Sequence, residues 1–543
     1  MRVETVIIGS GVAAAALSQR LLELDPQASI LMLEAGPRVK TQDFGLWENF
    51  LITRDTPYKP YLDLPFPAQD REGENANTGI ASGEMMDARV MAYGGSTLHW
   101  GGWSFRMKPE DFRQASTSGV GTDWPFGYDV LEPYYGEAEH YLAVSGDSAD
   151  RTVPRTRDYP FPAFPYTLQD RDFANAFDGL GITHGHLPIA RRGVSAVPSR
   201  HAPCQTTGTC KYCPFGARFV AGDYLDDFRA WNDLPNFEIR LGAIVETIIA
   251  SGSGRVDGVI YLDRDSGEEV TVQADRVVIA AGAVESAKLL LRSPAPGHPN
   301  GMGNQGDMVG RNLITHPFFR FKGKLLENPK KLQAEMDFPT LVSRHFDTEA
   351  EQAKGKFVLV PPAEAVKVDF LGQMRAGKSR STIEAALTGP AELQLHGMIE
   401  IFGRPGNRIE NLIGRNRIGL HQTQVSLSPD GDHLARMDEI RAIAASVYVA
   451  MGAELLGPPS ISWRIDHAAS TCRMSDDPAQ GVVNSDLQVH GLDNLYVCSN
   501  AVMPSIGAVN PTVTLGALAL RLGDRLANGS DRASQGLTEQ VPV

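Results

Sequence analysis

A glycine-rich turn near the N-terminus constrains the fold more than any other feature of this sequence. An apolar run at residues 5–8 leads directly into Gly9-Ser10-Gly11-Val12-Ala13-Ala14, and a helical run over 15–24 follows. A second apolar run, Ser29–Leu33, ends at Glu34. Strand, glycine turn, helix and second strand within about 30 residues predict a βαβ unit of the dinucleotide-binding type.

Each part of this unit has a physical role in holding a dinucleotide. The glycines permit a tight turn and let the backbone approach a pyrophosphate, while the helix N-terminus supplies N–H donors. Glu34 lies 20 residues after Ala14, where a carboxylate can accept hydrogen bonds from ribose hydroxyls. The unit therefore predicts a dinucleotide cofactor, and an acid at this position fits both FAD and NAD.

The composition limits the class of protein that surrounds this unit. Of the 543 residues, 42% are hydrophobic and 21% are charged, as in ordinary globular proteins. The net charge of −14 repels phosphate backbones, so we expect no nucleic-acid partner. No apolar run is long enough to cross a bilayer and no charged leader precedes one, so the sequence predicts no transmembrane segment and no export signal of its own.

Further apolar runs outline the rest of the chain. Buried strands are predicted at Phe237–Leu241, Arg276–Ala280 and Leu495–Val497, and a hairpin between Val256 and Val272. Alternating patterns over about 325–430 predict an antiparallel sheet. Helices are predicted over 436–456 and 516–526, an irregular excursion over 42–82, and a frayed end after 527.

Several motifs spread along the chain together resemble one family of flavoproteins. They read GGSTLHWGGW at 94–103, RVVIAAGAVESAKLLL at 276–291, VGRNLITH at 309–316, HAASTCRM from His467 and NPTVT from Asn510. In this order they resemble the glucose–methanol–choline (GMC) family, in the branch of pyranose oxidases and bacterial membrane-linked sugar dehydrogenases. The resemblance implies an α/β, Rossmann-type FAD-binding domain and an α+β substrate domain built on an antiparallel sheet.

This resemblance also implies how the chain is divided and which residues surround the cofactor. We expect an FAD-binding domain from 1–106, 200–324 and 460–530, a substrate domain from 107–199 and 325–459, and a tail over 531–543. Besides the glycine turn and Glu34, the expected cofactor-binding residues are Gly94, Gly95, Ser96, Thr97, His99, Trp100, Val245, Ala281, Gly282, Asn500, Ala501, Pro511 and Thr512.

The resemblance assigns places to some of these residues. Val245 is expected near the adenine, Ala281 and Gly282 near the pyrophosphate, and the last four residues of the set near the flavin. In fungal pyranose oxidases the histidine that matches His99 is tied covalently to the flavin. The neighbours Leu98 and Gly101 depart from that segment, so we expect FAD to be held without a covalent bond.

Two polar residues near the C-terminus fit the chemistry of alcohol oxidation. A flavin takes the hydride from carbon at N5, and a base must take the hydroxyl proton. His467 suits the base because the pKa of an imidazole lies near neutrality, so small shifts keep it neutral. Asn510 can orient the same hydroxyl without titrating. In the resembling family a His–Asn or His–His pair has this role, so we expect His467 and Asn510 to be catalytic.

Three of the five cysteines, Cys204, Cys210 and Cys213, lie within ten residues of one another and just after His201. This clustering, in a chain without a disulfide framework, indicates metal ligation. With His201 the set forms a Cys3His zinc site, and without it three thiolates match a [3Fe–4S] cluster. A [4Fe–4S] cluster requires a fourth ligand, and free thiols in an ordinary loop are the remaining alternative.

We favour the [3Fe–4S] cluster because it can carry electrons away from a flavin. A flavin accepts two electrons, and an iron–sulfur cluster can pass them singly to a cytochrome, whereas zinc has no redox chemistry. The segment TTGTCKYCPFGARF also resembles the catalytic subunits of bacterial FAD glucoside 3-dehydrogenases, and more loosely those of glucose and fructose dehydrogenases.

These observations lead to one functional hypothesis. The chain is expected to be an FAD-dependent dehydrogenase that oxidises a secondary hydroxyl, at C3 of a pyranoside, and exports electrons through the cluster. Its alternatives are a pyranose or C-glycoside 3-oxidase that uses O2, an FAD glucose, fructose or polyol dehydrogenase, and a non-catalytic flavin subunit.

The resemblance also implies partners and a location. It implies a small subunit that carries an export signal and a c-type cytochrome as electron acceptor. The chain would then reach the bacterial periplasm by co-export, or stay in the cytoplasm if no such partner exists.

Overall fold

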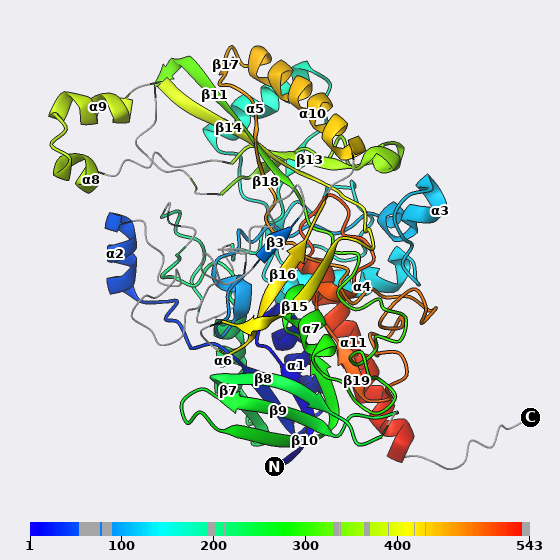
Figure 1. Cartoon of the computed structure of the whole chain (residues 1–543). Coiled ribbons are helices and arrows are strands. Elements are labelled where there is room, and N and C mark those ends of the chain that lie inside the picture. Colours follow the sequence, from blue (N-terminus) through cyan, green and yellow to red (C-terminus); the bar gives the residue numbers. More distant parts are fainter. Residues whose placement is uncertain are drawn as a thin grey trace, which may run out of the picture.

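The computed structural model describes most of the chain, and Figure 1 shows a sheet at each end of the molecule. The described residues are 1–53, 76–78, 89–193, 201–207, 209, 212–252, 254–329, 336, 338–362, 370–388, 390–416, 419–428 and 431–534.

A seven-stranded sheet contains the N-terminal βαβ unit. Its order is β7 (Phe237–Leu241), β2 (Ile30–Glu34), β1 (Arg2–Ile8), β10 (Glu269–Ile279), β9 (Gly258–Asp263) and β8 (Ala243–Ile249), with β19 (Leu495–Val497) beside β10. Neighbouring strands are parallel except that β9 is antiparallel to β10 and to β8. Every residue of β2 is buried, as expected for a strand in a parallel sheet that is covered on both faces.

Helices that follow the strands cover this sheet. α1 (Val12–Leu24) follows β1, and its buried Ala13–Ala16 run lets it lie close to its neighbours. α7 (Gly282–Leu291) follows β10 and repeats the arrangement of strand, turn and helix. α11 (Thr512–Ser534) packs against both α1 and α4 (Tyr128–Tyr141). The carboxyl ends of β1, β2 and β10 therefore lie at one edge, with helix N-termini beside them.

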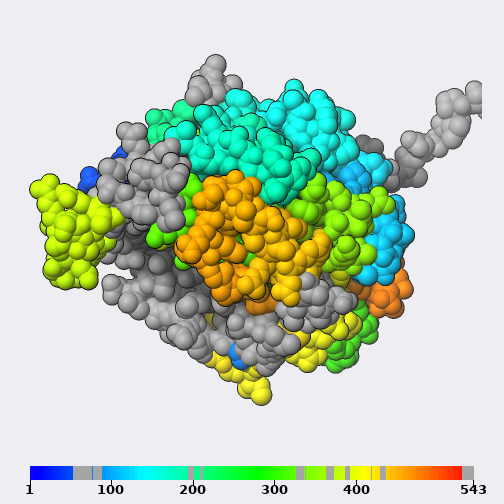
Figure 2. Space-filling model, turned by 90° about the horizontal axis from the view of Figure 1, so that it is seen from above, coloured from blue at the N-terminus to red at the C-terminus, as the bar shows by residue number. Residues whose placement is uncertain are grey.

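The second sheet is antiparallel and has five strands. Its order is β13 (Phe357–Val360), β14 (Pro390–Ile399), β11 (Phe318–Pro329) and β17 (Glu454–Leu455), with β18 (Ser460–Ser462) also paired to β11. Its core packs on α5 (Leu168–Gly179) and α10 (Gly431–Ala450). In Figure 2, α10 (orange) lies beside the teal α5 on the upper face. The two sheets confirm the predicted fold class.

Shorter elements complete the described part of the chain. The small sheets pair β15 (Arg408–Arg415) with β16 (His421–Ser426) and β3 (Ala76–Thr78), β12 (Leu341–Val342) with β6 (Gly185–His186), and β4 (Ser145–Gly146) with β5 (Phe161–Pro162). The remaining helices are α2 (Phe44–Thr53), α3 (Gln114–Ser118), α6 (Ala221–Trp231), α8 (Phe370–Arg375), α9 (Arg380–Thr388), η1 (Gly95–Leu98), η2 (Pro109–Arg113), η3 (Glu349–Lys354) and η4 (Asn500–Val502).

Two predicted segments contain helices that the sequence patterns did not indicate. The segment 42–82, predicted to be irregular, contains α2, whose Phe50 packs on Tyr212. Helices α8 and α9 interrupt the region 325–430, predicted to be strands alone. Contacts with distant parts of the chain explain α2, since Trp47 also donates a hydrogen bond to Thr209 at 3.0 Å.

Two predicted helices have different limits from those expected. α10 ends at Ala450, because Gly452 adopts a left-handed φ of 66° and the chain then joins the antiparallel sheet as β17. α11 begins directly after Pro511 and continues to Ser534, so the first residues of the predicted tail 531–543 are helical and the rest lie outside the described residues. No helix in the described part of the chain has both the length and the apolar character that crossing a membrane requires.

Candidate active site

The glycine turn lies at the carboxyl edge of the seven-stranded sheet. Ile8 pairs with Leu33 on one side and with Ile279 on the other, so Gly9, Glu34 and Ala280 come together at this edge. Gly9 has a φ of 103°, and a Cβ there would lie 2.7 Å from the carbonyl oxygen of Ala280. Only glycine fits this close approach, as expected where a ligand is held by backbone.

The carboxylate of Glu34 is buried at the same edge. Its Oε2 accepts a hydrogen bond from Ser10 Oγ at 2.6 Å, and its Oε1 accepts one from the Gly36 N–H at 2.8 Å. Burial raises its pKa, although these hydrogen bonds oppose that effect. Each carboxylate oxygen has a further lone pair, so Glu34 can still accept a ribose hydroxyl as predicted.

The segment 94–100 closes over the glycine turn. The Gly94 N–H donates to Ser10 Oγ at 3.1 Å, and a Cβ on Gly95 would lie 3.1 Å from the Cα of Gly11. Thr97 Oγ1 donates to the Gly94 carbonyl at 2.5 Å and accepts from the Ala221 N–H at 2.9 Å. The structure therefore brings together two glycine-rich segments that are about 85 residues apart in the sequence.

The other predicted cofactor residues lie on neighbouring elements. Ala281 and Gly282 begin α7 at the end of β10, and Asn500 and Ala501 lie in η4 directly after β19. The Ser470 and Cys472 N–H groups donate to the Asn500 and Ala501 carbonyls at 3.3 and 2.8 Å. Asn500 Oδ1 is buried and has no hydrogen-bond partner among the residues that the structure describes, as expected for an atom that faces a ligand.

Two further predicted residues are less directly linked to this edge. Val245 lies in β8, where its carbonyl accepts from Arg292 Nη2 at 3.0 Å. His99 follows η1 at the edge of the 94–100 segment, and its side chain is half-buried. β8 contacts β2, and His99 directly follows η1, while the contact of both residues with a cofactor stays a prediction.

Backbone pairing places His467 and His316 opposite each other, with their ring planes at 87°. Ile314 and Ala469 form an antiparallel bridge, with hydrogen bonds of 3.2 and 2.9 Å between their backbone groups. In an antiparallel pair, the residue two positions after Ile314 lies opposite the residue two positions before Ala469. These residues are His316 and His467, and their Nδ1 atoms lie 3.0 Å apart.

Asn510 approaches His467 from the other side. It is the residue before Pro511, just ahead of α11, and its Nδ2 lies 3.1 Å from His467 Nε2. In the described part of the chain, the buried Asn510 Oδ1 has no hydrogen-bond partner. The predicted pair thus meets in the folded chain although its members are 43 residues apart.

The surroundings of His467 favour the neutral imidazole. Burial lowers its pKa to about 3, and the positive charge of Arg464 contributes in the same direction. A neutral imidazole has one unprotonated nitrogen that can accept a proton from a substrate hydroxyl. His467 can therefore act as a base at neutral pH.

Sequence reasoning did not single out His316, although it ends the VGRNLITH motif. Its Nε2 lies 2.7 Å from the Gly507 carbonyl oxygen, and burial together with the charge of His467 lowers its pKa to about 3. A titratable residue at the end of a motif could have indicated a functional role for His316. Its contact with His467 could not be predicted, because 151 residues separate the two in the sequence.

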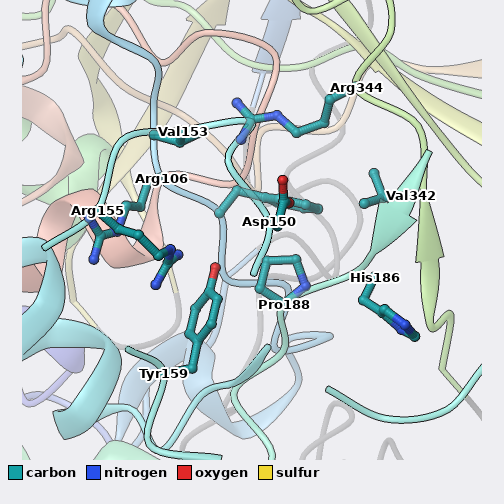
Figure 3. A pocket seen from close by; sticks show the side chains of 10 residues that line it. Arg106, Asp150, Val153, Arg155, Tyr159, His186, Pro188, Val342 and Arg344 are labelled. Carbon is teal, nitrogen blue, oxygen red and sulfur yellow. The ribbon is translucent and has the colours of Figure 1, made fainter. Parts of the chain in front are cut away.

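A separate pocket is lined by other residues (Figure 3). It has about 350 Å³ of empty volume and is lined by Phe105, Arg106, Asp150, Val153, Arg155, Tyr159, His186, Pro188, Val342 and Arg344, none of which is a predicted site residue. Glu139 pairs with both Arg106 and Arg155, and Asp347 pairs with Arg344. The positive charges of these arginines in the pocket are therefore balanced by carboxylates of the protein. We assign the reaction to His467 and not to this pocket.

The cysteine segment, residues 204–213, is linked to the 94–100 segment by residues that follow it. Cys204 and Cys213 are free and partly buried, while Cys210 lies outside the described residues. Arg218 donates to the carbonyls of Leu98 and, at 3.0 Å, Trp100. Trp100 Nε1 donates to the Phe219 carbonyl at 2.9 Å. These hydrogen bonds place the cysteine segment beside residues predicted to bind the flavin.

His201, the fourth ligand of the zinc alternative, is engaged elsewhere. Its Nε2 lies 2.9 Å from Asp227 Oδ2, and its ring stacks on Tyr224 with centroids 4.5 Å apart. Within the ranges described, no three His, Cys, Asp or Glu side chains converge on a metal position. Because Cys210 lies outside these ranges, the [3Fe–4S] cluster and the Cys3His zinc site both stay predictions.

Cys472 and Cys498 do not belong to this segment. Both are fully buried in the main core, and burial raises the pKa of Cys498 to about 12. Burial also raises the pKa of Cys472. Protonated, buried thiols are inert, so both have a packing role.

Comparison with known proteins identifies the family. Two sequence models described as GMC oxidoreductase match residues 189–318 and 459–519, which contain His316, His467 and Asn510. The chain belongs to the GMC oxidoreductase family. The fructose dehydrogenase large subunit of Gluconobacter japonicus is 27% identical over 97% of this chain and 98% of its own length. The C-glycoside 3-oxidase of Arthrobacter globiformis is 24% identical over 97% and 95%.

A solved structure has the same fold. Pyridoxine 4-oxidase from Mesorbium loti superposes with a TM-score of 0.63 at 19% identity, over 97% of this chain and 99% of that one. This likeness confirms the predicted two-sheet fold, and the matches to GMC oxidoreductase show that the chain is an oxidoreductase.

GMC oxidoreductases bind FAD, and the residues of this chain fit that cofactor. The cradle at Gly9, Gly11 and Gly95 has no room for a Cβ at Gly9 and little at Gly95, as a backbone-bound pyrophosphate requires. Asn500 and Asn510 each keep a buried, unpaired Oδ1 at the positions predicted to face the flavin and the substrate. Bound FAD would supply the acceptor for a hydride.

Proposed function

We propose that this oxidoreductase oxidises a secondary hydroxyl of a sugar or glycoside, at C3 of a pyranoside, to a ketone. The observation that supports the proposal is the group formed by His467 Nε2 and Asn510 Nδ2, which lie 3.1 Å apart. This group offers one basic nitrogen and one amide at the same point, which is what a hydroxyl that must lose its proton requires.

The roles of the two side chains follow from their hydrogen-bonding capacity. The substrate O–H donates to the unprotonated Nε2 of His467, and the Asn510 amide donates to the substrate oxygen. Bound FAD would accept the hydride from carbon, and His467 Nε2 would take the hydroxyl proton, so that the alcohol would become a ketone. The depressed pKa of His467 keeps this nitrogen unprotonated, and the substrate hydroxyl would replace the Asn510 amide as its hydrogen-bond donor.

The electrons would leave through a [3Fe–4S] cluster held by Cys204, Cys210 and Cys213. Two features support this exit: three thiolates are the ligand set of such a cluster, and Arg218 ties the segment to the predicted flavin loop. The similarity to a fructose dehydrogenase large subunit, whose name implies a further subunit, supports a partner subunit. We propose that this partner is small and that a c-type cytochrome accepts the electrons. Export to a bacterial periplasm would depend on a signal carried by that small partner.

An oxidase is the second candidate. The similarity to a C-glycoside 3-oxidase favours direct reaction with O2 and would give the cysteine segment no role in the reaction. The two candidates differ in where the electrons go and share the chemistry at His467.

A single experiment tests the proposal and separates the candidates. The purified, FAD-containing enzyme is mixed anaerobically with a panel of free sugars and glycosides, and flavin absorbance is followed before products are identified by NMR. Bleaching by a pyranoside with a 3-keto product supports the proposal, whereas a panel without bleaching contradicts it. Rapid peroxide formation in air favours the oxidase, and slow peroxide formation with fast reduction of a cytochrome favours the dehydrogenase.

A further inference from the structure

His316, His467 and Asn510 form a continuous chain of hydrogen bonds that ends on the backbone. From one end to the other, the contacts are Asn510 Nδ2 to His467 Nε2, His467 Nδ1 to His316 Nδ1, and His316 Nε2 to the Gly507 oxygen. Their lengths are 3.1, 3.0 and 2.7 Å. Each contact must contain one hydrogen, which limits where the protons can be.

The backbone end of the chain fixes the first proton. A carbonyl oxygen can only accept, so His316 Nε2 must carry the hydrogen that it shares with Gly507. Since a neutral imidazole carries one hydrogen, the Nδ1 of a neutral His316 is unprotonated and accepts. The alternative is a doubly protonated His316, which its complete burial opposes.

The second proton follows from the first. An unprotonated Nδ1 on His316 requires that His467 Nδ1 donates across the 3.0 Å contact. The neutral His467 then has a bare Nε2, which accepts from the Asn510 amide. All three contacts are satisfied by this one arrangement, and the opposite tautomer of His467 would place two bare nitrogens against each other.

We infer that His316 is a positioning residue that sets the tautomer of His467, so that the basic lone pair lies on Nε2, the nitrogen beside Asn510. The inference rests on the proposed role of His467 as base, and it adds a residue that does not touch the substrate. When His467 takes up the substrate proton on Nε2, its Nδ1–H still donates to His316, which stabilises the imidazolium.

Two substitutions of His316 separate the two ends of its ring. In His316→Asn the amide oxygen can replace Nδ1 and still accept from His467, whereas the link to Gly507 is lost. In His316→Gln the amide nitrogen can replace Nε2 and donate to Gly507, whereas the acceptor for His467 is lost. A structural role would make both variants similar, but the inference makes them different.

The expected result is a large difference in the rate of anaerobic flavin reduction. His316→Asn should stay within about threefold of the unchanged enzyme, while His316→Gln should lose roughly 100-fold, as when a histidine adopts the wrong tautomer or loses its supporting partner. KM should change little in either variant, because His316 does not contact the substrate. Equal rates for the two variants overturn the inference.

A matched control tests whether losing any buried histidine has this effect. His298 is 2% exposed, and its Nδ1 lies 2.8 Å from Gln305 Nε2, outside the group described above. His298→Gln should leave flavin reduction unchanged. A loss there as large as that of His316→Gln overturns the inference.

A spectrum of the resting enzyme tests the tautomer without any turnover. With histidine labelled at both ring nitrogens, 15N chemical shifts distinguish a protonated from a bare nitrogen, and His467→Ala identifies the signals of His467 by difference. The inference predicts Nδ1–H and a bare Nε2 at neutral pH, and the reverse pattern overturns it. If His467→Ala reduces its flavin normally while this pattern is present, the proposed function fails and the assigned tautomer stands.

Discussion

The His316–His467–Asn510 group and the Cys204–Cys213 segment are both predicted to take part in the reaction, but the protein holds them in different ways. Backbone pairing of Ile314 with Ala469 and a hydrogen-bond chain position the first group directly. The second is held by contacts at its flanks, at His201 and Arg218, and by the packing of α2 on Thr209 and Tyr212. Substitutions in the first should therefore alter the chemistry, and substitutions of the thiols should alter only what the thiols bind.

The largest effect should come from His467→Ala. Removing a general base costs roughly 10²- to 10⁴-fold, so anaerobic reduction of the flavin by substrate should slow by that factor. FAD content, read from absorbance after acid release, should be retained because the imidazole faces the substrate. A normal reduction rate in this variant would show that another group takes the proton.

Asn510→Ala should have a smaller effect on the same rate. The amide orients the substrate hydroxyl and does not take the proton, so we expect a loss of about tenfold, equal to the loss of one or two hydrogen bonds. Asn510→Asp, which places a carboxylate beside His467 Nε2, should raise the pKa of His467 and move the acid limb of the pH profile upward. An unchanged profile for Asn510→Asp would mean that the two side chains do not meet in solution.

Cys204→Ser should leave flavin reduction within about twofold of the unchanged enzyme, because hydride transfer does not need the thiol. Iron content should fall and transfer to cytochrome c should be lost, since a harder oxygen ligand suits the cluster less than thiolate does. Cys498→Ala is the matched control, since this buried thiol lies in the core and should keep its iron. Zinc without iron in anaerobically purified protein would contradict the cluster.

The smallest effect should be that of mild acid on the unchanged enzyme. Because burial lowers the pKa of His467 to about 3, the ring stays neutral as the pH falls from 8 to about 5. Flavin reduction should therefore be nearly constant over this range when measured by stopped flow. A loss with a midpoint near about 6.5, the ordinary value for histidine, would show that the imidazole is exposed to water.

The same shift has a consequence for stability. His316 and His467 both have a folded pKa of about 3, whereas in the unfolded chain they would take up protons near about 6.5. The unfolded state therefore binds more protons between these values. The free energy of unfolding should decrease as the pH falls through about 6.5, and His316→Asn should remove part of this dependence in chemical denaturation.

The sequence predicted the seven-stranded sheet better than the site that it supports. Strand β7 and the βαβ unit were predictable because an apolar run between turn residues is a local signal, as Gly9 and Glu34 are. The meeting of His467 with Asn510 came from a resemblance to a family. The contact with His316 could not be read from the sequence, because it depends on the register of two segments that pair far apart along the chain.

The predicted limits of the helices were wrong for a related reason. α10 stops at Ala450 because residues 454–455 form β17 on the antiparallel sheet, so a tertiary contact ended a pattern whose apolar spacing continued. The helix α2 exists where Phe50 and Trp47 find partners in the cysteine segment. Local helix propensity carries no information about the strand that β17 joins or about the residues that α2 contacts.

The order of strands in the large sheet also determines when the protein can fold during synthesis. β1 pairs with β10, and β10 pairs with β19. Ile8 therefore cannot form its pair with Ile279, nor Ile279 its pair with Val497, until the later strand has been synthesised. At ribosomal rates of about 5–20 residues per second, roughly 25 to 100 s separate the emergence of the first strand from that of the last. During that interval β1 and β2 can pair with each other, but β1 lacks β10 and α1 lacks α11, so the nascent chain exposes apolar surface that is prone to aggregate. Fragments that end before β19 should accordingly accumulate as inclusion bodies, however well their first 34 residues match a dinucleotide-binding unit.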